Sequence, residues 1–325
     1  MSSRSEHLLE IRDLSVKFYT YQGVLDAVDI DSLVLDRKQS LGLVGETGCG
    51  KSVTSLAILG LIPHPGKIER GAIIFDGEDL LGKTKEEMQA IRGGRISMIF
   101  QNPTSSLNPV FTIGDQIASV MRLHQRVDSN EARRRAVEML SLVQLSNPEK
   151  IVNAYPHELS GGMCQRAMIA MALACNPDLL IADEPTTALD VTIQAQILKL
   201  MKALREKLET SILLITHDLS VVAQTCDCVA VMYAGNKVEY GTARDVFKSP
   251  KHPYTQGLLR AIPKVGMIKD KLVGIDGTVP SMLEPPSGCR FHPRCPYAKE
   301  ICSTERPRSV ELGHDHTVSC VLYYG

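Results

Sequence analysis

Gly45-Glu-Thr-Gly-Cys-Gly-Lys51-Ser52 is the stretch of this sequence that decides the fold. It matches GxxxxGK[ST] and lies between a short apolar run, Ser40-Leu-Gly-Leu-Val44, and a segment of helical spacing from Ser52 to Leu61. Strand, glycine-rich turn and helix in this order predict a loop that cradles phosphate. The glycines let successive N–H groups point at phosphate oxygens, and the amino end of the helix adds its positive dipole. Because a strand-like run precedes the motif and a helical segment follows it, a glycine turn that matches the motif by chance is disfavoured.

The side chains of this loop predict ATP with Mg²⁺ as the ligand. We expect Lys51 to reach the β- and γ-phosphates and the Ser52 hydroxyl to ligate Mg²⁺. Cys49 is interpreted as a small residue that the loop tolerates. The expected nucleotide contacts in the loop are Gly45, Glu46, Thr47, Gly48, Cys49, Gly50, Lys51, Ser52 and Val53.

An acidic pair ends a second apolar run, Leu179-Leu-Ile-Ala-Asp183-Glu184. A phosphate loop needs a second magnesium carboxylate at the end of a neighbouring buried strand, so we expect Asp183 to hold the ion directly or through water. Glu184 is expected to accept a proton from the attacking water, because like-charge repulsion from its neighbour raises the pKa of a carboxylate toward that of a general base. A solvated turn is the ordinary alternative, and the phosphate loop upstream disfavours it.

A third element, Leu159-Ser160-Gly161-Gly162-Met163, opens a segment of helical pattern. Ser160 and two glycine amides at a helix amino end make a second anion site. With this element the sequence resembles the ABC-type ATPases, whose LSGG signature usually continues with Gln where this chain has Met163. In that family the signature closes on ATP held by the opposite subunit, so the resemblance implies two cassettes for each catalytic centre.

The resemblance runs across residues 8–245 and implies further roles. Gln101 is similar to the glutamine that touches magnesium and relays to the permease. Ala188-Leu-Asp190 resembles the D-loop, and Asp190 is expected at the nucleotide site. His217 resembles the switch histidine that contacts the γ-phosphate, although a histidine after a strand is more often structural.

The resemblance also implies an aromatic side chain near the amino end of the chain that stacks on adenine. Phe18 is the expected stacking partner, with Tyr19 and Tyr21 as alternatives.

Short strand-like runs alternate with segments of helical period, which predicts an α/β fold with a largely parallel sheet. The resemblance makes this a P-loop ABC ATPase cassette: a RecA-like parallel core, an antiparallel β subdomain and a helical insertion at about 102–165. We expect this nucleotide-binding domain to cover residues 1–245. Prolines then punctuate the sequence, and residues 246–325 are expected to form a small C-terminal metal-binding module.

Three stretches narrow the family: Gln101-Asn-Pro-Thr-Ser-Ser-Leu-Asn-Pro109, His252-Pro-Tyr-Thr255 and the cysteine-rich tail from Gly288. They resemble the ATPases of dipeptide and oligopeptide importers, although the second stretch alone could be only a helix start. The resemblance implies a second, non-identical ATPase, two integral membrane permeases and an extracytoplasmic solute-binding protein. Nickel, glutathione-like compounds and some sugars are alternative solutes of the same subfamily.

Four late cysteines, Cys289, Cys295, Cys302 and Cys320, are spaced x5, x6 and x17. Four thiolates in a tail that forms little core predict a metal that ties loops together. A [4Fe–4S] cluster fits this loose spacing, and the importer subfamily has members with one. Zinc is an alternative, with possible ligands at His292, His314 and His316, but the spacing lacks Cys-x2–4-Cys pairs. Free thiols are the third possibility.

The predicted nucleotide contacts all lie before residue 218, so we expect the tail to be dispensable for MgATP binding.

Composition limits the partners. A formal net charge of −1 gives no basic footprint, which argues against nucleic acid. The amino terminus lacks an apolar signal region, and the apolar run Ala167–Cys175 is far shorter than the ~20 residues of a membrane span. We therefore expect a peripheral protein at the cytoplasmic face of the cell membrane.

Two other function classes compete with transport. ABC ATPases of DNA repair or translation usually carry two cassettes or a long coiled-coil insert, whereas this chain has one cassette and a compact insert. A purely regulatory subunit is disfavoured because Lys51, Asp183, Glu184 and His217 are all present.

Overall fold

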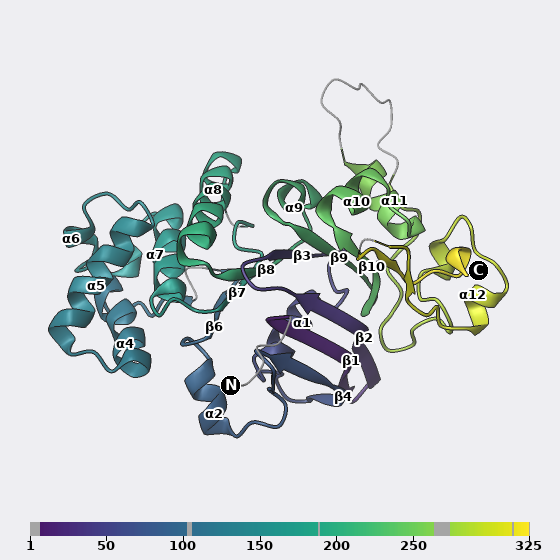
Figure 1. The fold of residues 1–325 in the computed structure, drawn as a ribbon, viewed down its shortest axis with the longest axis horizontal. Helices are drawn as coiled ribbons and strands as arrows, with labels where there is room; N and C mark the ends of the chain where they lie inside the picture. Colours follow the sequence, from purple (N-terminus) through teal and green to yellow (C-terminus); the bar gives the residue numbers. More distant parts are fainter. Residues whose placement is uncertain (1–6, 103–105, 188, 263–273, 314, 325) are drawn as a thin grey trace. The chain divides into compact units, whose positions relative to one another are not determined.

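The computed structural model describes residues 7–102, 106–187, 189–262, 274–313 and 315–324 (Figure 1). The chain forms two compact units. The first contains Met1–Gly82 and Ile215–Gly325, and the second contains Lys83–Leu214.

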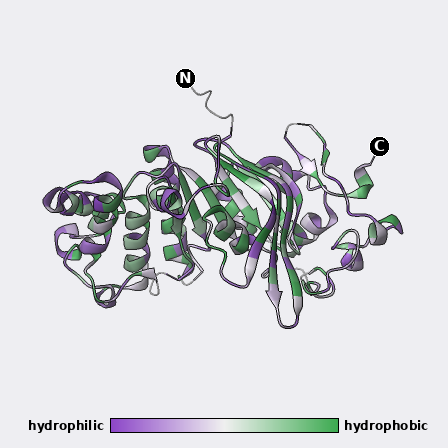
Figure 2. Cartoon of the chain, turned by 90° about the horizontal axis from the view of Figure 1, so that it is seen from below, coloured by the Kyte–Doolittle hydropathy of each residue, from purple (hydrophilic) through white to green (hydrophobic). Residues whose placement is uncertain are grey.

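An antiparallel sheet forms the amino-terminal part of the first unit. Its strands are ordered β2-β1-β4-β5, with bounds β1 Leu9–Thr20, β2 Gly23–Leu35, β4 Gly66–Phe75 and β5 Glu78–Asp79. Apolar side chains such as Ile11, Leu14 and Val16 are buried, and the long strands show hydrophobic and hydrophilic residues along their length (Figure 2). This is the antiparallel β subdomain that the sequence predicts.

The second sheet contributes strands to the first unit in the order β11-β12-β10-β9-β3. β3 and β9 pair in parallel and are buried along their whole length, which explains their continuous apolar sequences. The bounds are β3 Ser40–Val44, β9 Cys228–Tyr233, β10 Asn236–Thr242, β11 Val310–Glu311 and β12 Thr317–Val318. The helices of this unit are α1 Lys51–Ile58, α9 Leu219–Thr225, α10 Ala243–Lys248, α11 Pro253–Ala261 and α12 Ile301–Thr304.

The second unit combines three strands with a group of helices. β6 pairs with β7 in parallel, and β8 lies on the other side of β7. The strands span Ile96–Ile99, Leu179–Asp183 and Ser211–Thr216. The helices are α2 Lys85–Ile91, α4 Ile113–Gln125, α5 Ser129–Leu142, α6 Pro148–Ile151, α7 Gly161–Leu173 and α8 Val191–Leu208.

Helices α4, α5 and α7 pack on one another (Figure 1). They supply the helical insertion expected at about 102–165, although α7 extends the group to Leu173. The predicted stripe on α8 is also present, because Ile197, Leu200 and Leu204 are buried.

The predicted α/β cassette with mixed sheets is confirmed. The domain boundary at residue 245 stays a prediction. None of the helices among the described residues combines the length and the apolar character that crossing a membrane requires.

Candidate nucleotide site

The phosphate loop leaves the buried end of β3 and turns through three glycines with positive φ: Gly45 at 155°, Gly48 at 81° and Gly50 at 100°. A Cβ at Gly45 would lie 2.2 Å from the carbonyl oxygen of Met232, and one at Gly50 would lie 2.6 Å from that of Ala27. Glycine is therefore required at both positions for steric as well as conformational reasons.

Lys51 begins α1 and turns its side chain back into the loop. Its Nζ donates hydrogen bonds to the carbonyl oxygens of Gly45 at 2.8 Å and Glu46 at 3.0 Å, and the residue is 6% exposed. Ser52 is exposed in the first turn of α1, whereas Cys49 is buried, and burial raises the pKa of its thiol. A glycine cradle with an ammonium group inside and a hydroxyl beside it fits phosphate and Mg²⁺.

Glu46, the second loop residue, is bound by residues far along the chain. Its backbone N–H donates to the Tyr254 hydroxyl oxygen at 3.0 Å, and its carboxylate accepts from Arg294 at 2.9 Å. The sequence analysis expected Glu46 in the loop but missed both partners. The His252-Pro-Tyr-Thr motif could have pointed to Tyr254, whereas no sequence signal pointed to Arg294.

Glu184 and Gln101 meet at the carboxyl ends of two paired strands in the second unit. Gln101 Nε2 donates to Glu184 Oε2 at 2.8 Å, and Thr187 Oγ1 donates to the same oxygen at 2.9 Å. Asp183, at the end of β7, is 8% exposed. Glu184 itself has φ at 46°, a conformation that costs energy for a residue with a side chain. Sequence analysis named Gln101 and Glu184 but missed Thr187.

Ser160 is the N-cap of α7, where its Oγ accepts a hydrogen bond from the backbone of Met163 at 3.4 Å. Asp190 is the N-cap of α8, and its Oδ1 accepts a hydrogen bond from the backbone N–H of Ile193 at 2.9 Å. The two caps are close, because a Cβ at Gly162 would lie 3.1 Å from Cγ2 of Ile193. The signature and the expected D-loop residue therefore lie together.

Comparison with known proteins agrees with this geometry. A model of the ABC transporter family matches residues 28–187, and one of the oligopeptide/dipeptide transporter C-terminal region matches 238–302. The dipeptide transport ATP-binding protein DppD of Bacillus subtilis is 48% identical over 98% of this chain and 95% of its own length. The oligopeptide transport ATP-binding protein AppD of Bacillus subtilis is 51% identical over 97% of each chain. This chain is an ABC transporter ATP-binding protein of the dipeptide and oligopeptide family.

A solved dimeric bacterial ABC transporter cassette extends the comparison to structure. It is 26% identical and has a TM-score of 0.64 over 73% of this chain and 99% of that chain. As an ABC ATPase, the chain is an enzyme that binds and hydrolyses ATP.

The remaining residues predicted for this ABC ATPase stay predictions. Phe18 is half-buried on β1, and a Cβ at Gly66 would lie 2.6 Å from its ring carbon Cε1. Tyr21 is 96% exposed. His217 follows β8 and is exposed, Val53 is half-buried, and Ala188 lies outside the described residues.

The four late cysteines gather in the C-terminal part of the ABC ATPase. The backbone N–H of Cys289 donates to the carbonyl oxygen of Cys302 at 2.8 Å. Burial, together with the neighbouring thiols of Cys302, Cys320 and Cys295, raises the pKa of Cys289 to about 11. Cys289 is therefore a neutral thiol at pH 7.

The predicted metal-binding module is not supported. Within the described ranges, no group of three or more His, Cys, Asp or Glu side chains is arranged to hold a metal ion. The histidines considered for zinc do not change this. His316 binds the buried Glu239 at 2.8 Å, His292 Nδ1 contacts the carbonyl oxygen of Cys289, and His314 lies outside the described residues.

Proposed function

We propose that this ABC ATPase hydrolyses ATP to drive the import of dipeptides or oligopeptides through a separate membrane permease. The observation that carries the proposal is the combination, in one chain, of a nucleotide-binding cassette with a C-terminal region that matches the oligopeptide/dipeptide transporter model. Relatives named for dipeptide and oligopeptide transport align along nearly the whole chain and support the same solute class.

We assign nucleotide binding to the phosphate loop. Lys51 would hold the phosphates, and Ser52, Gln101 and Asp183 would hold Mg²⁺, which screens phosphate charge when bound. The ammonium group of Lys51 already lies inside the loop, which supports its role.

We assign the proton transfer to Glu184, with His217 at the γ-phosphate. The carboxylate of Glu184 would accept the proton of the attacking water. Two hydrogen bonds to its Oε2, from Gln101 and Thr187, support this role because they orient the carboxylate. Gln101 would thereby link the carboxylate to the loop that follows β6.

A second ATPase and two permeases complete the proposed transporter, with an extracytoplasmic solute-binding protein and this chain at the cytoplasmic face of the membrane. The signature residues Ser160, Gly161 and Gly162 would close on the ATP of the neighbouring subunit. The exposed position of Ser160 and Gly161 supports this role, as does the dimeric form of the solved cassette. The departure from the usual signature at Met163 motivates a non-identical partner.

Reconstitution of the chain with the permeases, the second ATPase and the binding protein in vesicles tests the proposal. We expect ATP hydrolysis to rise when a di- or oligopeptide is supplied, with accumulation of labelled peptide inside. Stimulation by nickel or a glutathione-like compound but not by peptides would reassign the solute. Full turnover by the chain alone would reject obligatory pairing.

The metal content of the late cysteines is a separate hypothesis. Anaerobically purified protein with a [4Fe–4S] cluster would be brown and contain about four iron and about four sulfide per chain. About one zinc per chain would indicate a zinc site instead of the cluster. Protein without metal would indicate that the four cysteines are free thiols.

A further inference from the structure

We propose that Arg294 and Tyr254 position the phosphate loop, so that the C-terminal module (residues 246–325) sets the affinity for MgATP. The inference rests on the assignment of the loop to ATP. It replaces the expectation that the module is dispensable for nucleotide binding. The two residues contact a single loop residue, Glu46.

Arg294 holds the Glu46 carboxylate with both ends of its guanidinium group. Nη1 donates to Oε2 at 2.9 Å and Nη2 donates to Oε1 at 3.3 Å. The guanidinium group is fixed by the carbonyl oxygens of Asp276 and Ile275, at 2.9 and 3.2 Å, and by the Tyr233 hydroxyl at 3.3 Å. The Arg294 side chain is 6% exposed and that of Glu46 is 30% exposed, so the pair is partly shielded from water. A bidentate contact of this kind has defined geometry as well as charge.

Tyr254 holds the backbone of the same loop residue. Its hydroxyl oxygen accepts from the Glu46 N–H at 3.0 Å, and the residue is 0% exposed. The Tyr254 ring packs on Tyr233 with centroids 4.6 Å apart and on Phe291 at 5.4 Å. Because its ring is fixed by two aromatic neighbours, the hydroxyl oxygen presents a fixed acceptor to the loop.

Glu46 is therefore held at three points. Tyr254 binds its N–H, Arg294 binds its carboxylate, and Lys51 binds its carbonyl oxygen at 3.0 Å. The loop geometry offered to the nucleotide thus depends on two residues of the C-terminal module.

The charges of Arg294 and Glu46 also affect nucleotide binding directly. A carboxylate within a loop that binds phosphate repels the ligand, and the repulsion is strong where water is excluded. The guanidinium group of Arg294 offsets the charge of Glu46. Without Arg294, Glu46 would present an uncompensated negative charge beside the phosphates.

Equilibrium titration of the full chain with MgATP tests the proposal, with thermal unfolding as a separate measure of stability. We expect Arg294→Met to raise the Kd about 10-fold, which corresponds to a loss of about 1.4 kcal/mol, because the Glu46 carboxylate is left uncompensated beside the phosphates. Adding Glu46→Gln to Arg294→Met should restore the Kd to within about 3-fold of wild type, because the uncompensated charge is removed. A merely structural role of Arg294 would not give this recovery.

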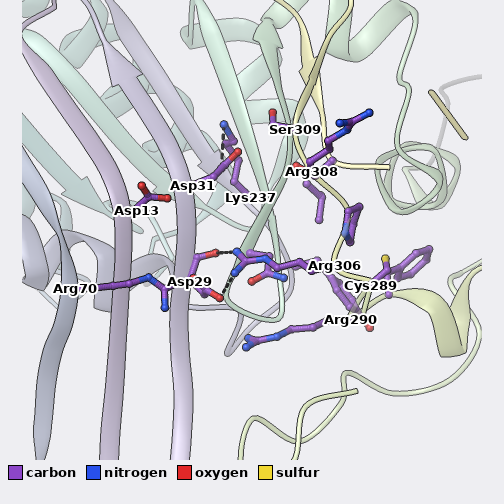
Figure 3. A pocket seen from close by; sticks show the side chains of 16 residues that line it. Asp13, Asp29, Asp31, Arg70, Lys237, Cys289, Arg290, Arg306, Arg308 and Ser309 are labelled. Atoms are coloured by element: carbon purple, nitrogen blue, oxygen red, sulfur yellow. Dashed lines mark hydrogen bonds and ion pairs between the residues drawn. The ribbon is translucent and has the colours of Figure 1, made fainter. Parts of the chain in front are cut away.

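Arg306→Ala is the matched control within the same module. Arg306 binds Asp29 in the pocket of Figure 3. Asp29 also accepts a hydrogen bond from Arg70 there. The residues that line this pocket include none of the phosphate loop. The Kd of Arg306→Ala for MgATP should stay within about 2-fold of wild type, because losing an ordinary exposed ion pair has a small effect.

Three results would overturn the proposal: wild-type affinity in folded Arg294→Met, a double variant as weak as Arg294→Met, or an equal loss in Arg306→Ala. If Arg294→Met does not fold, Tyr254→Phe removes only a hydroxyl and keeps the packed ring. Its Kd should rise about 3-fold, the value of one hydrogen bond, and an unchanged Kd would reject the role of Tyr254. Wild-type protein that fails to bind MgATP would instead reject the function of the loop.

Discussion

The two units hold their site residues by different kinds of contact. In the second unit, Gln101 and Glu184 meet because β6 and β7 are parallel neighbours whose carboxyl ends coincide. In the first unit, Glu46 is held by Arg294, 248 residues further along the chain and outside any regular pairing. Sheet register places the side chains that we propose for hydrolysis, whereas irregular packing of the C-terminal module supports the loop that we propose for nucleotide binding. Damage to the two units should therefore have separable effects.

Replacing the proposed base of the second unit should give the largest effect. Glu184→Gln removes the proton acceptor and keeps an amide that can bind Gln101, so turnover should fall ~10²–10⁴-fold while MgATP still binds. Turnover is measured with the partner subunits present, and binding by titration. Thr187→Val, which removes only a hydroxyl that orients Glu184, should lower turnover less than Glu184→Gln does. Near-normal turnover in Glu184→Gln would dismiss the assignment.

Replacing the lysine of the first unit should affect binding instead. Lys51→Ala removes a charged donor, so the Kd for MgATP should rise about 10- to 100-fold. Nucleotide titration measures the change, and Lys248→Ala on the exposed end of α10 serves as a control of equal charge. Unchanged affinity in Lys51→Ala would count against the phosphate-loop assignment.

His252, the N-cap of α11 in the C-terminal module, should make the stability of the first unit sensitive to acid. Burial lowers the pKa of His252 to about 4, although Glu239 opposes this shift. The unfolded histidine titrates near pH 6.5 and binds the proton first, so stability falls as the pH drops from about 6.5 toward 4, by about 2 kcal/mol at pH 5.

His252→Asn tests this pH dependence. Asn can still cap α11 by accepting from Tyr254, as His252 does at 3.1 Å, but it does not titrate. Urea unfolding at pH 7 and pH 5 should show a smaller loss for His252→Asn than for wild type. Equal losses would contradict the role of His252.

The smallest effect is expected in the second unit at the signature helix. Ser160→Ala removes the N-cap of α7 and should cost about 1 kcal/mol of stability, whereas Ser160→Thr keeps the oxygen. Thermal unfolding compares the two variants. Identical midpoints for both would show that the cap contributes nothing to stability.

Much of the fold and part of the site follow from sequence patterns. The phosphate loop is predictable because its glycine positions are dictated by backbone geometry, as Gly45 and Gly50 show. Glu184 is predictable because an acidic pair follows an apolar strand segment, whereas Gln101 was predicted from its resemblance to a family motif. Thr187 is a partner that only the turn after β7 reveals.

The contacts of the C-terminal module could not be predicted. Tyr254 and Arg294 reach Glu46 through loops and short helices, for which periodicity gives no register. The metal site at the four cysteines was predicted from their spacing, the weak core of the tail and the family resemblance, none of which determines whether thiols converge to ligand distance. Among the described residues they do not form such a group.

The distance in sequence between Glu46 and Arg294 also has a consequence for the newly made chain. Arg294 leaves the ribosome 248 residues after Glu46, which corresponds to roughly 10–50 s at the usual rates of synthesis. During that interval the amino-terminal segments emerge and begin to fold while the loop carboxylate has no guanidinium partner. A nascent chain therefore acquires its complete phosphate loop only after Arg294 has emerged, and products terminated before Arg294 lack it.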